Sequence, residues 1–286
     1  MTVELSGFMV DMAKAMKESP TEADLRKEVN RFLSSRKSDN RRPGIHVTDL
    51  VDPCLRRLAW KIMLPETKDP APPPATSRIF DQGKSIHQWW QNRVYGPMGI
   101  LIGKWECCGC GAVVEGKMPG ERCAAQVVPS AQMGRPEQES RRCGGEWEYV
   151  EPEVNFLIDG VNVTGNSDGL LQWKGQRATL EMKGYRTENW KKIRVPDPAH
   201  IFQASTYSPT LETSQVLISY IDKETWDTKD FLVPLQPGAY AWAEDHVRTA
   251  LRLVNEKRIE QAHRVCASKT AAKAVRCGFS GMLCFR

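Results

Sequence analysis

Several features that define other classes of protein are missing from this chain of 286 residues. It has no run of about 18 apolar residues, so we expect no transmembrane helix. Its first segment, MTVELSGFMVDMAKAMKESP, carries acidic residues and lacks a continuous apolar stretch. We therefore expect an amphipathic helix there and no secretory signal. No internal repeat is visible, and the G-x4-G-K-[ST] phosphate-binding loop is absent. These absences favour a globular cytoplasmic protein without a nucleotide-driven motor of its own.

The composition is that of an ordinary globular protein, with 41% hydrophobic and 26% charged residues. The length suffices for one large core, or for a core and a small module. A formal net charge of +5 is compatible with a polyanionic partner but does not require one.

Nine cysteines are an odd number for a disulfide framework. Without an export signal we expect a reducing compartment, where clustered cysteines more often hold metal than form disulfides. Five of them lie between residues 107 and 143, one lies at position 54, and three lie between residues 266 and 284. The two groups need separate explanations.

The middle group predicts a zinc-ribbon-like module inserted at residues 105–149. Cys107 and Cys110 form a C-x2-C pair, and Cys123 and Cys143 complete a set of four ligands. Glycines follow Cys108, Cys110 and Cys143, as the tight turns of zinc knuckles require. Cys108 is the spare cysteine, although Cys108 and Cys110 could exchange roles with Cys107. The module could bind nucleic acid, dock a partner or stabilise a long insertion.

The rest of the chain alternates between helical and strand patterns, which predicts an α/β fold. Two breaks read as hairpin turns, at Asp159-Gly160 and at Lys174-Gly175-Gln176. A Pro-rich linker is expected at 68–77, and Asp52-Pro53 is expected to begin a helix. The other expected helices are 21–36, 77–95, 197–209 and 238–263, and the expected strands are 153–158, 161–173, 177–185, 215–221 and 229–235.

The second hairpin carries two acids and a lysine. Side chains alternate along a strand, so Glu181 and Lys183 share one face and Met182 points the other way. Asp168 lies on the preceding strand, which the turn brings alongside. Carboxylate oxygens are suitable ligands for Mg²⁺ or Mn²⁺. A bound ion would lower the pKa of a water molecule that it holds and would neutralise charge on a phosphate oxygen. Taken alone, an E-x-K motif on a strand more often belongs to a solvent-exposed face of the sheet.

Polar residues on two helices accompany this hairpin. His87 lies four residues after Gly83, whose position inside a helix suggests a close approach. Gln203 and Tyr207 are four residues apart on a later helix and share a face with His200. Individually, each of these residues would more often be an ordinary surface or packing residue.

The ordered set G-x3-H, D, E-x-K and Q-x3-Y resembles the RecB-like branch of the PD-(D/E)XK nucleases, over roughly residues 44–95 and 150–286. The resemblance implies a restriction-endonuclease-like core, with a mixed central sheet flanked by helices. In that family the His, Asp and Glu bind Mg²⁺ or Mn²⁺, the Lys assists the attacking water, and the Gln and Tyr support the site. The corresponding residues here are His87, Asp168, Glu181, Lys183, Gln203 and Tyr207. Ser167 departs from the pattern, because the family name places proline there.

One cysteine before this core and three after it resemble the iron–sulfur members of the branch, including AddB-type helicase–nucleases and CRISPR adaptation nucleases. The resemblance implies a [4Fe–4S] cluster on Cys54, Cys266, Cys277 and Cys284. The family commonly has C-x2-C before its last cysteine, whereas ten residues separate Cys266 from Cys277. A zinc site with the same four thiolates and free buried thiols remain the alternatives.

Basic residues suggest where DNA could bind. Arg56 and Arg57 lie on the Cys54 helix together with Lys61, and a later loop combines Trp190 with Lys191, Lys192 and Arg194. Basic groups beside an aromatic ring suit phosphate contact and base stacking, although surface lysines are usually only solvated.

The sequence therefore predicts an N-terminal helical region (1–43), a nuclease core in two parts (44–104 and 150–286) and the zinc module between them. The expected activity is metal-dependent hydrolysis of DNA phosphodiesters, and the resemblance favours exonuclease action on ends or single strands. A helicase or recombination partner would supply any unwinding. The alternatives are a non-catalytic DNA-binding or adaptor protein that keeps the fold, and a zinc-only nucleic-acid-binding protein with a fortuitous E-x-K.

Overall fold

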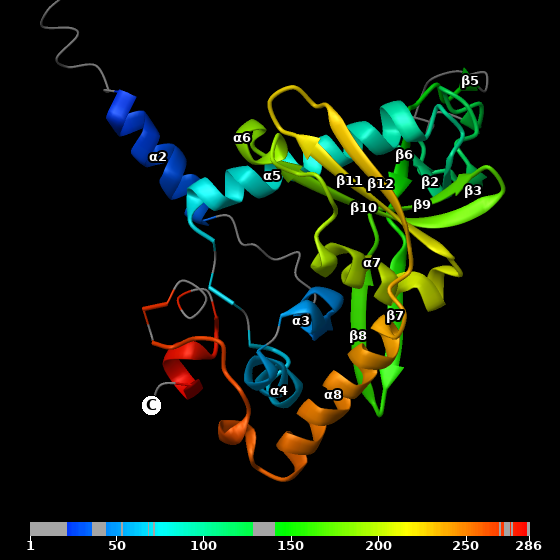
Figure 1. Ribbon diagram of the computed structural model, residues 1–286. Helices are drawn as coiled ribbons and strands as arrows, with labels where there is room; N and C mark the ends of the chain where they lie inside the picture. Colours follow the sequence, from blue (N-terminus) through cyan, green and yellow to red (C-terminus); the bar gives the residue numbers. More distant parts are fainter. Residues whose placement is uncertain are drawn as a thin grey trace, which may run out of the picture. The chain divides into compact units, whose positions relative to one another are not determined.

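A computed structural model describes residues 22–35, 44–52, 54–67, 69–70, 72–127, 141–268, 270–271, 275 and 277–284 (Figure 1). The chain divides into two compact units, residues 1–42 with 70–80 and residues 43–69 with 81–286. The described part of the first unit is α2 (Glu22–Ser35) and the start of α5 (Pro74–Trp90). Within it, Arg78 Nη1 donates to Asn30 Oδ1 at 3.0 Å.

The second unit contains a mixed sheet of seven strands. Its order is β12 (Thr228–Pro234), β11 (Gln215–Asp222), β10 (Gln176–Tyr185), β9 (Gly169–Trp173), β2 (Leu101–Cys107) and β3 (Val113–Lys117), with β6 (Trp147–Val150) also paired to β2. The β10–β11 pair is parallel and the other pairs are antiparallel. The connection between β10 and β11 contains α6 (Thr187–Trp190) and α7 (Pro198–Leu211).

Helices cover both faces of this sheet. Ile86 of α5 packs with Leu180 and Met182 on one face, and Ala204 of α7 packs with Val216 and Ile218 on the other. The prediction of an α/β fold with a mixed central sheet flanked by helices is confirmed. A further pair of short strands, β4 (Gln126–Val127) and β5 (Arg141–Arg142), lies in the cysteine-rich segment.

Both predicted hairpin turns are present. Asp159 and Gly160 have φ of 48° and 86°, and Lys174 and Gly175 have φ of 49° and 81°. Two successive left-handed residues form the type I′ turn that matches the twist of a hairpin. The first turn joins β7 (Glu153–Ile158) to β8 (Val161–Asn166), and the second joins β9 to β10. Gln176, expected in the turn, belongs to β10.

The predicted strand 161–173 is wrong as a single strand, because the chain changes sheets at Ser167 and Asp168. The first half is β8, which pairs with β7 and with β1 (Ile45–His46) in a separate three-stranded sheet. The buried Ser167 hydroxyl lies 3.0 Å from Gly169 O and 3.2 Å from Leu180 O. These contacts fix the break and place Asp168 just before β9.

Several helix boundaries differ from the predicted ones. The helix expected to begin at Asp52-Pro53 begins at Leu55, as α4 (Leu55–Met63) with Cys54 at its N-cap, and a short helix that was not predicted, α3 (Val47–Val51), ends just before Asp52. Helix α5 begins inside the predicted linker and ends in a π-helical turn, η1 (Gln91–Tyr95). Helix α8 (Ala239–Asn255) ends early because Lys257 is left-handed, with φ of 55°, and a short 3-10 turn, η2 (Ile259–Gln261), follows. A π-helical turn, η3 (Ser280–Cys284), lies near the C-terminus.

The helix predicted within residues 1–20 lies outside the described residues, as does the polar segment 128–140 of the predicted module. In the part of the chain that is described, no helix combines the length and the apolar character needed to span a bilayer.

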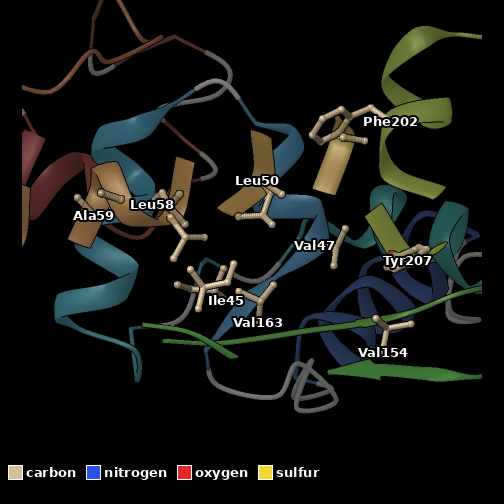
Figure 2. Close-up of a cluster of buried hydrophobic side chains, with 14 of the residues drawn as sticks. Ile45, Val47, Leu50, Leu58, Ala59, Val154, Val163, Phe202 and Tyr207 are labelled. Atoms are coloured by element: carbon tan, nitrogen blue, oxygen red, sulfur yellow. The ribbon is translucent and has the colours of Figure 1, made fainter. Parts of the chain in front are cut away.

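The largest hydrophobic cluster joins the β7–β8 hairpin to α3, α4, α7 and α8 (Figure 2). Val154 and Val163 of the hairpin face Leu50 and Leu58 of the small helices. Figure 2 also shows Phe202 and Tyr207, both from α7, on one side of this cluster. The ring of Tyr207 is therefore fixed by the core, while its hydroxyl is directed to a polar group on the same helix.

A buried ion-pair network connects α3 and α4. Asp49 Oδ1 accepts from Arg57 Nη1 at 2.7 Å, and Asp49 Oδ2 lies 2.8 Å from Lys61 Nζ. Arg57 also binds Asp69 at 2.7 Å. Burial opposes ionisation of Asp49, but the charges of Lys61 and Arg57 outweigh it and lower the pKa of the carboxyl below its usual value.

Asp49→Asn is expected to destabilise the protein by about 3 kcal/mol at neutral pH, because the half-buried cations Lys61 and Arg57 lose the carboxylate that lies between them. The pKa of Asp49 is lower in the folded state than the unfolded value of about 3.9, so its stabilisation is present above that pH and is lost as the pH falls below it. Urea unfolding of wild type and variant over a pH series measures the difference. A difference that stays constant down to pH of about 3 would contradict this assignment.

Candidate active site and metal centre

The acid–lysine site forms where β9 and β10 meet. Strand β10 places Glu181 and Lys183 on one face, and Met182 between them is fully buried in the opposite cluster. Lys183 forms an ion pair with Glu181 Oε1. Asp168 Oδ2 accepts from the backbone N–H of Met182 at 2.6 Å. The structure thus brings the three predicted residues together, and their roles in a reaction stay a prediction.

His87 reaches this site from α5. Its Nδ1 lies 3.3 Å from Asp168 Oδ1. One ligand atom each from His87, Glu151 and Asp168 lie within 4.8 Å of one another, a mixed nitrogen and oxygen set that could hold a divalent ion. A Cβ added at Gly83 would meet nothing within 4 Å, so the protein itself makes no close approach there.

Glu151 was not among the predicted site residues. It follows β6, a strand that leaves the cysteine-rich module, and the predicted ligand set contained Glu181 in its place. Glu181 is only 2% exposed and pairs with Lys183, whereas Glu151 is partly exposed beside His87. No local motif marks Glu151. Only the pairing of β6 with β2 brings it to the site.

Gln91 connects the two acids of this group. Its buried side chain donates from Nε2 to the backbone O of Asp168 at 2.7 Å and lies 3.2 Å from Glu151 Oε1. Gln91 begins the π-helical turn that follows the His87 helix. One helix end therefore positions both His87 and the amide that orients the acids.

Helix α7 supplies the predicted glutamine and tyrosine. Asp197 caps it by accepting from Ala199 N at 2.9 Å, with Pro198 at its first position. Gln203 Nε2 donates to the Tyr207 hydroxyl at 3.3 Å. Burial and the negative charges of Glu181 and Asp168 raise the pKa of Tyr207, which keeps the phenol protonated.

His200, expected on the same face, lies instead with its Nδ1 3.0 Å from the Tyr220 hydroxyl. Burial and the positive charge of Lys183 lower the pKa of His200, so its ring is neutral at neutral pH. The positive charge near the acids therefore comes from Lys183 and His87 and not from His200.

The two acids of the hairpin differ in their electrostatics. Burial raises the pKa of Glu181 to about 7, with the negative charge of Asp168 contributing, although Lys183 opposes the shift. Burial opposes ionisation of Asp168 too, but its hydrogen bond with His87 and the charges of His87 and Lys183 lower its pKa. The pKa of Lys183 is raised because the two acids outweigh its burial. A bound cation would favour the ionised form of both acids.

Gly165 of β8 provides the space that Tyr207 occupies. A Cβ at this position would lie 2.9 Å from Tyr207 Cε1 and 3.1 Å from Val47 Cγ2, closer than packed atoms allow. Gly165→Ala is therefore expected to displace the tyrosine and to destabilise the fold by about 1–3 kcal/mol. Chemical unfolding measures this, with Gly83→Ala as the control, which should be neutral or stabilising because helix α5 gains a better helix former. Equal effects of the two substitutions would contradict the packing argument.

Four cysteines of the middle group converge as predicted, in what we call the four-cysteine centre. The sulfurs of Cys107, Cys110, Cys123 and Cys143 lie within 4.8 Å of one another. Two of the Sγ–Sγ distances are 3.5 Å and 3.8 Å. Tetrahedral metal–sulfur bonds of about 2.3 Å place sulfurs about 3.8 Å apart, so the four thiols fit a single ion. Cys108, the predicted spare, is exposed and lies outside the group.

Glycines and backbone amides shape this centre. Gly109 N donates to Cys107 Sγ at 3.3 Å, and Ala125 N donates to Cys123 Sγ at 3.4 Å. A Cβ at Gly145 would lie 2.7 Å from Cys107 Sγ and 2.8 Å from Gly109 N. Burial opposes ionisation of Cys107, but the hydrogen bonds from the Cys110 and Gly109 amides outweigh it and lower the pKa of the thiol to about 7. The local backbone therefore favours thiolate at this position.

The four flanking cysteines are all half-buried residues of the second unit. Cys277 and Cys284 pack against the largest core cluster, and the charge of Cys54 contributes to raising the pKa of both, after burial. Among the described residues they do not form a group with sulfurs as close as those of the middle centre. A cluster of four irons holds its thiolates farther apart than a single ion does, so the predicted [4Fe–4S] cluster, with Cys266 as fourth ligand, stays a prediction.

The arginines of α4 have partners inside the protein. Arg57 binds Asp49 and Asp69, and Arg56 Nε donates to Ala262 O at 3.1 Å. Lys61 binds Asp49 as well. These contacts give the helix a structural role, and the predicted DNA contacts of Arg56 and Arg57 stay untested.

The loop after β10 differs from α4, because its basic side chains are largely exposed. Lys191, Lys192 and Arg194 follow α6 directly. The Trp190 ring is not free for stacking on both sides, since Lys229 Nζ lies 4.3 Å from its centroid and Trp190 Nε1 donates to Tyr220 O. Trp190 therefore anchors the loop to β11, and the three basic residues extend from that anchor.

No protein-family model and no curated protein matches the chain. Among solved structures, the chain is similar to the crystal structure of the protein SSO0001, with 16% identity over 90% of this chain and 92% of that one and a TM-score of 0.42. It is also similar to an alkaline exonuclease (LHK-Exo) from Laribacter hongkongensis, with 18% identity over 38% of this chain and 60% of that one and a TM-score of 0.29. Similarities this remote do not establish an activity.

Proposed function

We propose that this chain is a metal-dependent deoxyribonuclease of the PD-(D/E)XK class. The observation that carries the proposal is the convergence of Asp168, Glu181 and Lys183 with His87 on adjoining elements. A purely structural ion pair would not need a histidine and a second acid beside it. A divalent ion bound there supplies charge that lowers the pKa of water and stabilises negative phosphate oxygens.

Different residues of the chain have different roles in the proposed reaction. His87 and Asp168, with Glu181, offer the nitrogen and oxygen ligands. Lys183, on the same face as Glu181, orients the attacking water and contacts the phosphate. Gln203 holds the Tyr207 hydroxyl beside the acids, which keeps that side of the site polar while the tyrosine ring seals the core.

The basic loop is the proposed path of the DNA backbone toward this site. Lys191, Lys192 and Arg194 follow the strand that carries Lys183, and exposed cations at this position attract phosphates. We propose zinc as the ion of the four-cysteine centre, since four thiolates in tetrahedral spacing suit it, and a [4Fe–4S] cluster for the flanking cysteines. We propose that the enzyme acts as an exonuclease on DNA ends or single strands. A helicase or recombination protein is its proposed partner.

The proposal is tested by incubating the full chain, purified anaerobically, with end-labelled linear DNA, single- and double-stranded, and with closed circular DNA of the same sequence. Mg²⁺, Mn²⁺ and EDTA are compared. We expect metal-dependent release of mononucleotides or short fragments from linear DNA and none from the circles. Cutting of the closed circular DNA would show that the protein is an endonuclease and not an exonuclease. Inertness toward every substrate with both metals would refute the nuclease.

A further inference from the structure

Glu151 is not one of the predicted site residues, but the residues around it indicate that it binds a metal ion. One oxygen of Glu151, one of Asp168 and a nitrogen of His87 lie within 4.8 Å of one another. Two carboxylates this close repel each other unless a cation lies between them. Among the described ion pairs, that of Lys183 is with Glu181 and not with Glu151.

The side chain of Glu151 is held in this direction. Gln91 Nε2 lies 3.2 Å from Glu151 Oε1 and donates to the backbone O of Asp168 at 2.7 Å. Gln91 is 1% exposed, so this amide has been removed from water and donates to the carboxylate of Glu151 and to the backbone carbonyl of Asp168. A buried amide that orients a carboxylate toward an imidazole is the arrangement expected around a metal ligand.

The strand that precedes Glu151, β6, comes from the four-cysteine centre. Trp147 of β6 pairs with Cys107 of β2, and Glu151 follows the end of β6. The same strand is tied to the turn after the His87 helix, since Tyr149 N donates to Asn92 Oδ1 at 2.8 Å and Arg93 lies 2.8 Å from Glu146. The Tyr149 hydroxyl continues the link by donating to Ile102 O and accepting from Leu170 N.

We propose that Glu151 is a ligand of the divalent ion together with His87 and Asp168, and that the four-cysteine centre positions it through β6. The inference rests on the proposed metal-dependent nuclease and extends its ligand set. It gives the cysteine module a role in the chemistry, because loss of order at the module would withdraw one ligand from the site.

The first test measures Mn²⁺ binding to the full chain by calorimetric titration and by the electron paramagnetic resonance of free Mn²⁺, without DNA. Glu151→Gln keeps the size of the side chain and an acceptor for Gln91, and it is expected to weaken Mn²⁺ binding by at least about tenfold. Glu148→Gln is the matched control, an exposed acid on the same strand, and should leave the affinity unchanged. Wild-type affinity in Glu151→Gln would overturn the inference.

The variant Asp168→Asn distinguishes an error in the role of Glu151 from a failure of the proposed function. If Asp168→Asn loses Mn²⁺ binding while Glu151→Gln keeps it, the site binds metal and only the role of Glu151 is wrong. If neither substitution changes the affinity, the metal site itself is misplaced and the proposed function fails with it.

The second test concerns the positioning by the module. Cys110→Ser, at an exposed ligand position, is expected to weaken Mn²⁺ binding about as much as Glu151→Gln does. The double variant should be no weaker than Glu151→Gln alone, because both changes remove the same ligand. Additive losses, or wild-type Mn²⁺ affinity in Cys110→Ser, would overturn the link. Should that variant not fold, Asn92→Ala, which removes the bond to Tyr149 N, takes its place in the same cycle.

Discussion

Lys183→Ala is expected to lower the rate of DNA cleavage at saturating Mn²⁺ by about 10²–10⁴-fold, the range typical for loss of a group that moves or orients a proton. Lys183 shares its face of β10 with Glu181 and is directed to the acids, so its removal takes away the cation nearest the attacking water. Mn²⁺ affinity should not fall, because a lysine is not a ligand and its charge opposes that of the ion. Single-turnover cleavage of end-labelled DNA and Mn²⁺ titration measure the two quantities.

Lys117→Ala, at an exposed position of β3, is the control and should cleave at the wild-type rate. A Lys183→Ala protein within a few-fold of the wild-type rate would show that the lysine only neutralises Glu181. A fall in Mn²⁺ affinity with an unchanged rate at saturation would lead to the same conclusion.

Cys123→Ser is expected to release the metal of the four-cysteine centre and to destabilise the fold around it by several kcal/mol. Cys123 is almost fully buried, and its Sγ lies 3.8 Å from the Sγ of Cys110. If serine replaces Cys123, a neighbouring thiol therefore cannot take its place as a metal ligand. Structural zinc binds small domains with roughly 10–16 kcal/mol, part of which is the folding free energy of those domains. Metal content per chain and thermal unfolding, monitored at the tryptophans of β2 and β6, measure the outcome.

Cys108→Ser is the matched control for this change. Cys108 is adjacent to Cys107, exposed and outside the ligand group, so its loss should leave one equivalent of metal and the melting temperature unchanged. If Cys108→Ser lost the metal and Cys123→Ser kept it, the ligand set would have to be reassigned.

The sequence predicted the elements whose signals are local. Asp159-Gly160 and Lys174-Gly175 have the left-handed residues that a two-residue hairpin turn requires, and alternation along β10 was enough to put Glu181 and Lys183 on one face. The C-x2-C spacing with its glycines predicted the four-cysteine centre in the same way. In each case the physical cause acts within a few residues.

Features that depend on distant contacts were missed. The chain changes sheets at Ser167 because that hydroxyl meets the backbone of β10, which no local pattern reveals. Glu151 belongs to the site because β6 pairs with β2, so it could not be found while residues 105–149 were treated as a separate insertion. The ion pairs of Arg57 with Asp49 and Asp69 could not be predicted either, because the two acids come from other segments of the chain.

The proposed function places Asp168 at a metal-dependent catalytic centre for DNA hydrolysis. The most direct measurement compares wild type with Asp168→Asn on end-labelled DNA in Mn²⁺, with Asp159→Asn, an exposed acid of the first hairpin turn, as control. We expect cleavage by wild type and control, and none above the EDTA background for Asp168→Asn. Cleavage by Asp168→Asn at the wild-type rate would contradict the account.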